Sequence, residues 1–263
     1  MEDSFHGRTM ATLTATGQPK YHKGFSPLVK GFDYSPFNDL DQVESLIDDE
    51  TCAIMTETVQ GEGGINIPSQ KFIKGLRDLC DRKNILLILD EVQCGMGRTG
   101  KYFAYQHYGI EPDIMTLAKA LGGGIAIGAM TAKKETAKSL VPGTHASTFG
   151  GNPLACAAGV AVFNTMEEDN LLQNVNKMGK YARERLDRLA DEFKIIKEVR
   201  TIGLMIGVEL NKPASGIVEK CIEAGLLLNC THDTVIRIMP QLTVKKEHID
   251  EGFGILKQVL QSV

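Results

Sequence analysis

The sequence predicts an α/β fold with a mostly parallel β-sheet, followed by a smaller C-terminal α+β unit. In the first two thirds of the chain, short apolar runs alternate with amphipathic stretches, as in β-α-β units. After about residue 194, short strand patterns alternate with two helical patterns, which indicates a second unit with its own core.

Composition limits the classes of protein that the chain can belong to. It has 263 residues, 43% of them hydrophobic, which is enough for one large domain or two ordinary ones. The net charge of -4 comes from 29 basic and 33 acidic residues along the whole chain, so neither nucleic acid nor a membrane is expected as a partner. Six separated cysteines without a C-x-x-C pair, and no signal-peptide or membrane-span pattern, predict a cytoplasmic protein.

The first unit is expected to contain four strands and one well-marked helix. Buried strands are predicted at Cys52–Met55 and Ile85–Leu89, with weaker candidates at Ile114–Leu117 and Ile127–Met130. Ser69, after a proline, is a plausible N-cap. The helix that follows it places these residues on one face: Phe72, Leu76, Leu79 and Cys80.

Helical patterns dominate from Asn152 to about Phe193 and suggest a connection between two domains. An alanine-rich stretch, Leu154–Phe163, is expected to be buried, and a break near Glu168–Asn170 precedes a charged amphipathic helix. We therefore predict a large domain at 1–167 and a small α+β domain at 168–263. The small domain is expected to have strands at 195–202, 204–210, 226–229 and 235–239, and helices near 217–224 and 247–259.

A glycine-rich segment, Gly95–Lys101, matches two nucleotide-binding patterns but lacks their context. Tyr102 stands where a phosphate-binding loop needs Ser or Thr, and no helix is expected to begin at these glycines. The dinucleotide pattern also requires its first glycine at the end of a strand, whereas here Asp90–Gln93 intervenes. Nucleotide binding is therefore disfavoured.

Asp90 and Lys119 suggest a different cofactor, pyridoxal phosphate. Asp90 ends an apolar strand, where ligands bind in open α/β sheets, although it could also only cap the next turn. Lys119 lies between apolar pairs and before three glycines, so we expect a desolvated and reactive amine; the alternative is an ordinary surface lysine. The cofactor aldehyde needs an amine for its Schiff base, and its pyridine nitrogen needs an anion to stay protonated.

Four sequence blocks resemble the class III aminotransferases, and they occur in the order found in that family. They are ETVQGEGG at 57–64, LDEVQ at 89–93, LAKALGGG at 117–124 and STFGGNP at 147–153. SFHGRT at 4–9, LNC at 228–230 and IRIMP at 236–240 extend the resemblance over the whole chain. The resemblance implies the fold type I of pyridoxal phosphate-dependent transferases.

The same resemblance implies a role for each residue around the cofactor. Lys119 would form the Schiff base and carry the proton, and Asp90 would hold the pyridinium proton. Three side chains would fix the ring: Gln93 at its phenolic oxygen, Val92 on one face and Phe5 on the other. Thr148 would bind the cofactor phosphate across a homodimer interface. For Phe5 and Val92 the alternative is simple core packing.

The implied reaction transfers the δ-amino group of N-acetylornithine to 2-oxoglutarate, giving N-acetylglutamate semialdehyde and glutamate in arginine biosynthesis. Arg8 would bind the carboxylate far from the reacting amine, and Arg237 the 2-oxoglutarate carboxylate beside the keto carbon. Glu62 would pair with Arg237 while an ω-amine reacts. Surface ion pairs are the alternative for these three residues. Ornithine, succinylornithine and 4-aminobutyrate are alternative substrates.

Family members carry a further N-terminal portion before the block at 4–9, including a Ser-Gly-rich loop and helix that bind most of the cofactor phosphate. Here Met1 stands four residues before Phe5. The resemblance therefore implies an incomplete large domain, with uncovered apolar surface and weakened cofactor binding. A non-catalytic relative that acts as a structural or partner-binding protein is the second hypothesis.

Overall fold

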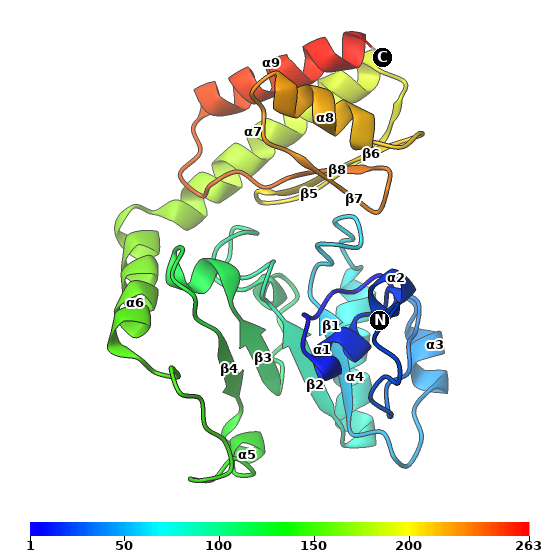
Figure 1. Ribbon diagram of the computed structural model, residues 1–263, viewed down its shortest axis with the longest axis vertical. Helices are drawn as coiled ribbons and strands as arrows, with labels where there is room; N and C mark the ends of the chain where they lie inside the picture. The colour runs from blue at the N-terminus through cyan, green and yellow to red at the C-terminus, as the bar shows by residue number, and fades with distance from the viewer. Residues whose placement is uncertain (263) are drawn as a thin grey trace.

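The computed structural model describes residues 1–262 and contains two β-sheets, one in each half of the molecule (Figure 1). The first sheet has the strand order β1-β2-β3-β4 and the second has the order β5-β6-β8-β7. In Figure 1 the second sheet and its helices form the upper part, and the N-terminal segments lie beside the first sheet in the lower part. The predicted combination of a mostly parallel sheet and a smaller α+β unit is confirmed.

The first sheet brings the ends of its parallel strands to one edge. β1 (Ala53–Glu57), β2 (Leu86–Asp90) and β3 (Ile114–Leu117) are parallel, and β4 (Ala129–Ala132) is antiparallel to β3. The register pairs Glu57 with Asp90, and Asp90 with Thr116. The last residue of β1 therefore lies beside Asp90. β4 begins two residues later than the sequence pattern predicts.

Helix α4 (Gln70–Lys83) packs on this sheet in the way that the sequence predicts. The Ser69 side chain accepts a hydrogen bond from the Phe72 amide at 3.1 Å, which is the expected N-cap. The apolar side chains of one face are buried against β1 and β2. The remaining elements of this half are short: α1 (Met10–Ala15), α2 (Pro19–His22), α3 (Leu40–Ser45), η1 (Ala104–His107), η2 (Lys119–Gly122) and α5 (Lys134–Ala137).

Two helices, α6 (Pro153–Glu168) and α7 (Leu171–Glu192), connect the sheets, and the predicted break between them is present. The expected burial of Leu154–Phe163 is wrong, because Leu154 is 71% and Val160 60% exposed. Only Ala155, Gly159 and Met166 are buried in α6. These three residues share one stripe of the helix, and the described chain leaves the opposite face of α6 uncovered.

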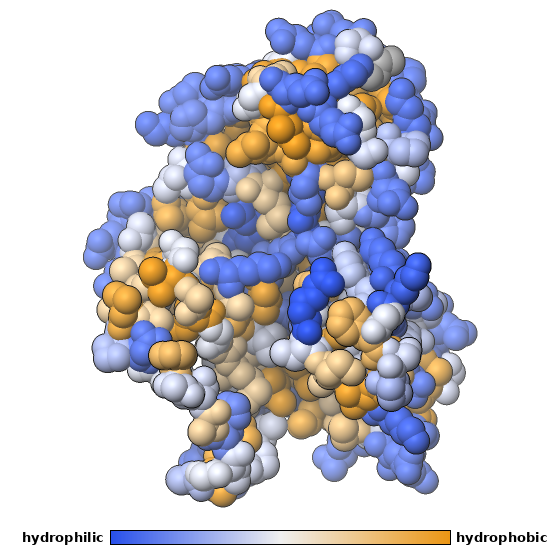
Figure 2. Space-filling view, in the orientation of Figure 1, coloured by the Kyte–Doolittle hydropathy of each residue, from blue (hydrophilic) through white to orange (hydrophobic). Residues whose placement is uncertain are grey.

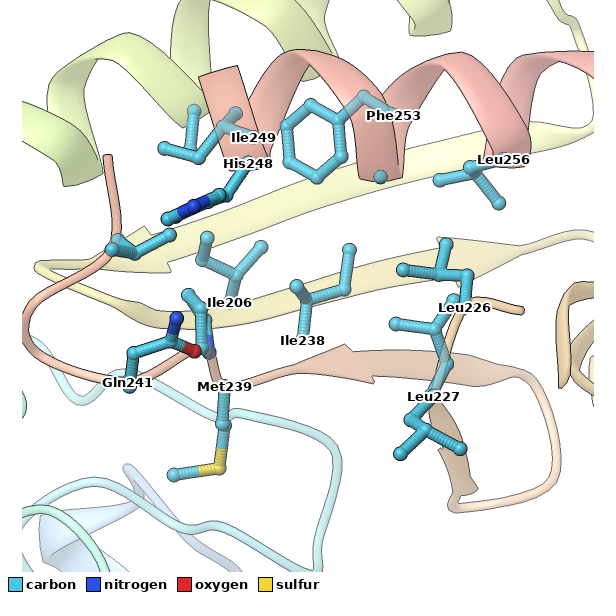
Figure 3. Close-up of a pocket in the computed structure, with 15 residues that line it drawn as sticks. Ile206, Leu226, Leu227, Ile238, Met239, Gln241, His248, Ile249, Phe253 and Leu256 are labelled. Carbon is cyan, nitrogen blue, oxygen red and sulfur yellow. The ribbon is translucent and has the colours of Figure 1, made fainter. Parts of the chain in front are cut away.

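The second half contains β5 (Ile196–Ile202), β6 (Met205–Leu210), β7 (Asn229–Thr231) and β8 (Val235–Ile238), all antiparallel to their neighbours. Helices α7, α8 (Ser215–Glu223) and α9 (Lys246–Gln261) cover one face (Figure 1). In Figure 3, Ile249 and Phe253 of α9 face Ile206 and Ile238 of the sheet. β7 begins later than predicted because Leu226–Leu228 line the apolar pocket beside these residues instead of pairing in the sheet.

The division into domains at residues 167 and 168 stays a prediction. One hydrophobic cluster extends from Val175 to Leu260, and separate clusters contain the residues of the first sheet. Val263, the last residue of the predicted small domain, lies outside the described residues. No helix in the described part of the chain, 1–262, is both long and apolar enough to span a membrane.

Candidate active site

Asp90 lies at the carboxyl end of β2 with only 3% of its surface exposed. Its Oδ1 accepts the Val92 amide at 3.0 Å, and its Oδ2 lies 2.8 Å from His6 Nδ1. The aspartate therefore does cap the turn after the strand. Because each oxygen has one protein donor, the carboxylate keeps lone pairs for a further N–H group.

Behind Asp90 lie two buried groups, Glu57 and His6, whose roles sequence reasoning missed. Glu57 accepts the Gly61 and Phe5 amides, each at 3.0 Å. Burial raises the pKa of Glu57 to about 7, although nearby His6 and the Gly61 amide act in the opposite direction. His6 Nε2 is buried without a hydrogen-bond partner among the described residues. Both residues stand in blocks that carry the family resemblance, but only the fold shows that they meet.

A third buried acid, Glu91, organises the turn that follows β2. Its carboxylate accepts the Ala104 amide at 2.8 Å, the Tyr105 amide at 2.9 Å and the Thr58 hydroxyl at 2.7 Å. Burial raises the pKa of Glu91 from its ordinary value. The side chain is therefore held from three directions, which fixes the turn that carries Val92 and Gln93.

Lys119 is exposed, so the expected desolvation of its amine is wrong. It begins η2 with a φ of 44°, a left-handed conformation that is uncommon outside glycine. Lys119 lines an open hollow together with Ala118 and the segment 124–128. Leu117 and Leu121, the apolar residues on either side of Lys119 in the sequence, belong to a buried cluster. No described segment covers Lys119 itself.

A polar cluster joins the two halves of the molecule next to this hollow. Arg237 Nη1 donates to Glu62 Oε1 at 2.6 Å and to Gln93 Oε1 at 3.0 Å, and its Nε donates to Asn229 at 3.1 Å. Burial alone would raise the pKa of Glu62, but the Arg237 guanidinium, with smaller contributions from Gln93 and Lys119, lowers it. The structure thus adds Gln93 to the pair of Glu62 and Arg237 that the family resemblance implies.

Phe5, Tyr21 and Arg8 form a second cluster near Asp90. The rings of Phe5 and Tyr21 meet edge to face at 5.3 Å, and the Arg8 guanidinium carbon lies 5.3 Å from the Phe5 centroid and 4.8 Å from that of Tyr21. Phe5 and Val92 are only partly buried. Neither side chain belongs to one of the four buried hydrophobic clusters of the described chain.

Thr148 is the predicted site residue that lies away from the others. It is exposed, in the segment between α5 and α6, beyond the edge strand β4 (Figure 1). The next residue, Phe149, is 79% exposed. The described chain therefore shows no contact between Thr148 and the residues around Asp90.

A buried acid, Asp90, thus ends β2, and an exposed lysine, Lys119, follows the adjacent parallel strand β3. The family described as Aminotransferase class-III matches residues 1–260, and the chain belongs to this family. Acetylornithine aminotransferases from Methanocaldococcus jannaschii and from Caldanaerobacter subterraneus subsp. tengcongensis are each 54% identical over all 263 residues. The chain spans 66% and 67% of their lengths, about two thirds.

Solved structures show the same fold. Ornithine aminotransferase from Toxoplasma gondii, described with partial occupancy of PLP at its active site, aligns with a TM-score of 0.94 at 33% identity. This alignment covers 100% of the chain and 63% of the other protein. N-acetylornithine aminotransferase from Stenotrophomonas maltophilia aligns with a TM-score of 0.82 at 37% identity, covering 89% of the chain and 63% of the relative. The predicted family and fold class are confirmed.

Proposed function

We propose that this chain carries the catalytic and C-terminal parts of a transaminase that uses pyridoxal phosphate to transfer the δ-amino group of N-acetylornithine to 2-oxoglutarate. The products are N-acetylglutamate semialdehyde and glutamate, a step of arginine biosynthesis. One observation carries the proposal: the buried Asp90 ends β2, and Lys119 follows the adjacent parallel strand β3 at the same edge of the first sheet. Membership of the class III family supports it.

The residues fit the cofactor at its reactive end. The Asp90 carboxylate is buried and has a free lone pair on each oxygen, which suits a pyridinium N–H. When bound, pyridoxal phosphate supplies an aldehyde for the amino group and a ring that accepts the electrons of a breaking C–H bond. His6 Nδ1 lies 2.8 Å from Asp90 Oδ2 and so helps to orient the carboxylate.

Each neighbouring side chain has a positional or proton-transfer role in the proposal. Lys119 Nζ takes the proton from the amino-bearing carbon of the donor, and its exposure leaves it accessible to that donor. Gln93 would donate to the phenolic oxygen of the bound cofactor. Val92 and Phe5 would pack on the two faces of its ring and so orient the bond that breaks.

Two arginines would bind the substrate carboxylates. Arg8 takes the carboxylate far from the reacting amine, and Arg237 takes the carboxylate beside the keto carbon of 2-oxoglutarate. While an ω-amine reacts, no carboxylate occupies that second position. The 2.6 Å pair with Glu62 then keeps the charge of Arg237 balanced.

A homodimer would complete the site. Thr148, exposed beyond β4, would reach the cofactor phosphate of a second copy. The surface around it supports this assembly, because exposed apolar side chains gather on the segment from β4 to α6 (Figure 2). They include Met130, Leu140, Val141, Phe149, Leu154 and Val160. Six free cysteines support a cytoplasmic location, where thiols stay reduced.

The test is to add pyridoxal phosphate to the purified chain and to record visible absorbance. We expect a yellow protein whose colour is lost in Lys119→Ala, while Glu135→Gln, a change on exposed α5, keeps it. A colourless wild-type protein would remove the cofactor claim for these 263 residues. Turnover with N-acetylornithine and with ornithine then decides the substrate, and a clear preference for free ornithine would overturn the narrower assignment.

A further inference from the structure

The loop that carries Glu62 is docked on the second sheet. Ile65 is fully buried, and a Cβ on Gly207 of β6 would lie 2.9 Å from the Ile65 Cβ and 3.2 Å from the Gly64 carbonyl oxygen. A Cβ on Gly64 would come within 3.3 Å of Val235 in β8. The segment 61–65 therefore connects the first sheet to the face of the second, with no space between them for another side chain.

Three backbone carbonyls of this loop are held by side chains. The Thr231 hydroxyl donates to the Glu62 carbonyl. Arg200 donates to the Gly64 carbonyl from Nε at 3.2 Å and from Nη2 at 2.8 Å. The Asn66 amide group donates to the Gly63 carbonyl at 3.0 Å. Every carbonyl from Glu62 to Gly64 is thus fixed, two of them from the second sheet.

Arg200 is itself held firmly enough to act as an anchor. Its Nη1 lies 2.5 Å from Glu209 Oε2 and 2.5 Å from Glu198 Oε2, and only 14% of its side chain is exposed. A guanidinium held by two carboxylates on its own sheet loses few additional rotamers when it binds a carbonyl. Arg200 therefore fixes the position of the loop relative to β5 and β6.

The Glu62 side chain has more freedom than its backbone. It is 24% exposed, and its carboxylate is held by Arg237 at 2.6 Å and more weakly by Gln93 at 3.4 Å. Rotation about its own side-chain bonds can release Arg237 without disturbing the loop. A fixed backbone also returns the carboxylate to the same place, which favours re-forming the pair.

We propose that Arg200 and Thr231 are positioning residues that hold the Glu62 backbone. The Glu62 carboxylate then leaves Arg237 and pairs with it again by rotation of the Glu62 side chain alone. This inference rests on the proposed function, in which Glu62 covers Arg237 while an ω-amine reacts. A loosened loop would cover Arg237 less often. Donors with a carboxylate beside the reacting carbon would then compete better with ω-amine donors.

The experiment compares Arg200→Gln and Thr231→Val with two matched controls in the full chain. Arg183→Gln removes a 2.9 Å bond from an arginine of α7 to the Val199 carbonyl, which also belongs to β5 but lies within the second half of the molecule. Thr231→Ser keeps the hydroxyl. Hydrogen exchange of the amides at the base of the loop, Gln60, Gly61 and Asn66, reports the backbone directly.

We expect faster exchange at these amides in Arg200→Gln and Thr231→Val, and wild-type exchange in both controls. In half-reactions, the ratio of kcat/KM for N-acetylornithine to kcat/KM for glutamate should fall about tenfold in Arg200→Gln, the order expected for loss of one charge-assisted hydrogen bond. It should fall in the same direction, but by less, in Thr231→Val, which loses a neutral hydrogen bond. A purely structural defect would lower both values together and leave the ratio unchanged.

Unchanged exchange in both test variants would overturn the inference. Faster exchange with an unchanged donor ratio in an active enzyme would overturn it as well, because the loop would then be loosened without effect on Arg237. If the wild-type chain transfers no amino group from either donor, the proposed function fails instead. The exchange measurement still decides whether Arg200 and Thr231 hold the loop.

Discussion

Glu57→Gln should change how the stability of the protein depends on pH. Glu57 is buried at the end of β1 beside His6 and Asp90, and burial raises its pKa from 4.5 to about 7. Glutamine has nearly the same shape but does not titrate. The substitution therefore removes the cost of ionising a buried carboxyl group.

The sign and the size of this pH effect on the unfolding free energy follow from the folded and unfolded pKa values of Glu57. Because the folded pKa is raised above the unfolded one, the stabilisation is complete below pH 4.5 and is lost as the pH rises through about 7. A rise from 4.5 to about 7 corresponds to about 3 kcal/mol of unfolding free energy, at about 1.4 kcal/mol for each tenfold change in proton affinity. Relative to Glu57→Gln, the wild-type protein should therefore lose about 3 kcal/mol between about pH 4 and pH 8.

Urea unfolding at several pH values, followed by circular dichroism, measures this difference. The control is Glu44→Gln on exposed α3, where the glutamate only pairs with Arg82 at 3.3 Å on the surface. Its unfolding free energy should follow the wild-type pH dependence. If Glu57→Gln also runs parallel to the wild type across this range, Glu57 does not hold a proton in the folded protein, and the reasoning from its burial is wrong.

Two further predictions concern the helix cap and the carboxylate site. Ser69→Ala should lower the unfolding free energy by about 1 kcal/mol, because the Phe72 amide loses its 3.1 Å acceptor; Ser69→Thr should lose much less in the same urea titration, and an equal loss in both would contradict the capping role. Arg237→Leu should lower kcat/KM for 2-oxoglutarate by about tenfold to a hundredfold, the loss expected when a charged hydrogen-bond partner is removed. Arg188→Leu on α7 serves as the control for loss of an arginine. Wild-type kinetics in Arg237→Leu would show that Arg237 does not bind the substrate carboxylate.

Local patterns predicted the elements of the first half well. The strands at β1, β2 and β3 and the Ser69-capped helix appear within one or two residues of their predicted bounds, because a buried strand or an amphipathic helix is specified by its own apolar spacing. The burial of α6 and the desolvation of Lys119 were mispredicted. An apolar sequence shows that a segment can be buried, but only a neighbouring element can bury it, and the described chain provides none at these two places.

The sequence by itself determined the family, the order of the strands along the chain and the residues whose side chains can react or bind a ligand. All three depend on residue types at fixed spacings. Only the tertiary structure decided which of these residues meet. The contact of His6 with Asp90 joins residues 84 positions apart, and that of Arg237 with Gln93 joins residues 144 positions apart. Such contacts depend on strand register and on how the second sheet packs against the loop at 61–65, which follows the first sheet. Neither is encoded in a local pattern. The raised pKa of Glu57 and the fixed backbone of Glu62 are consequences of that packing.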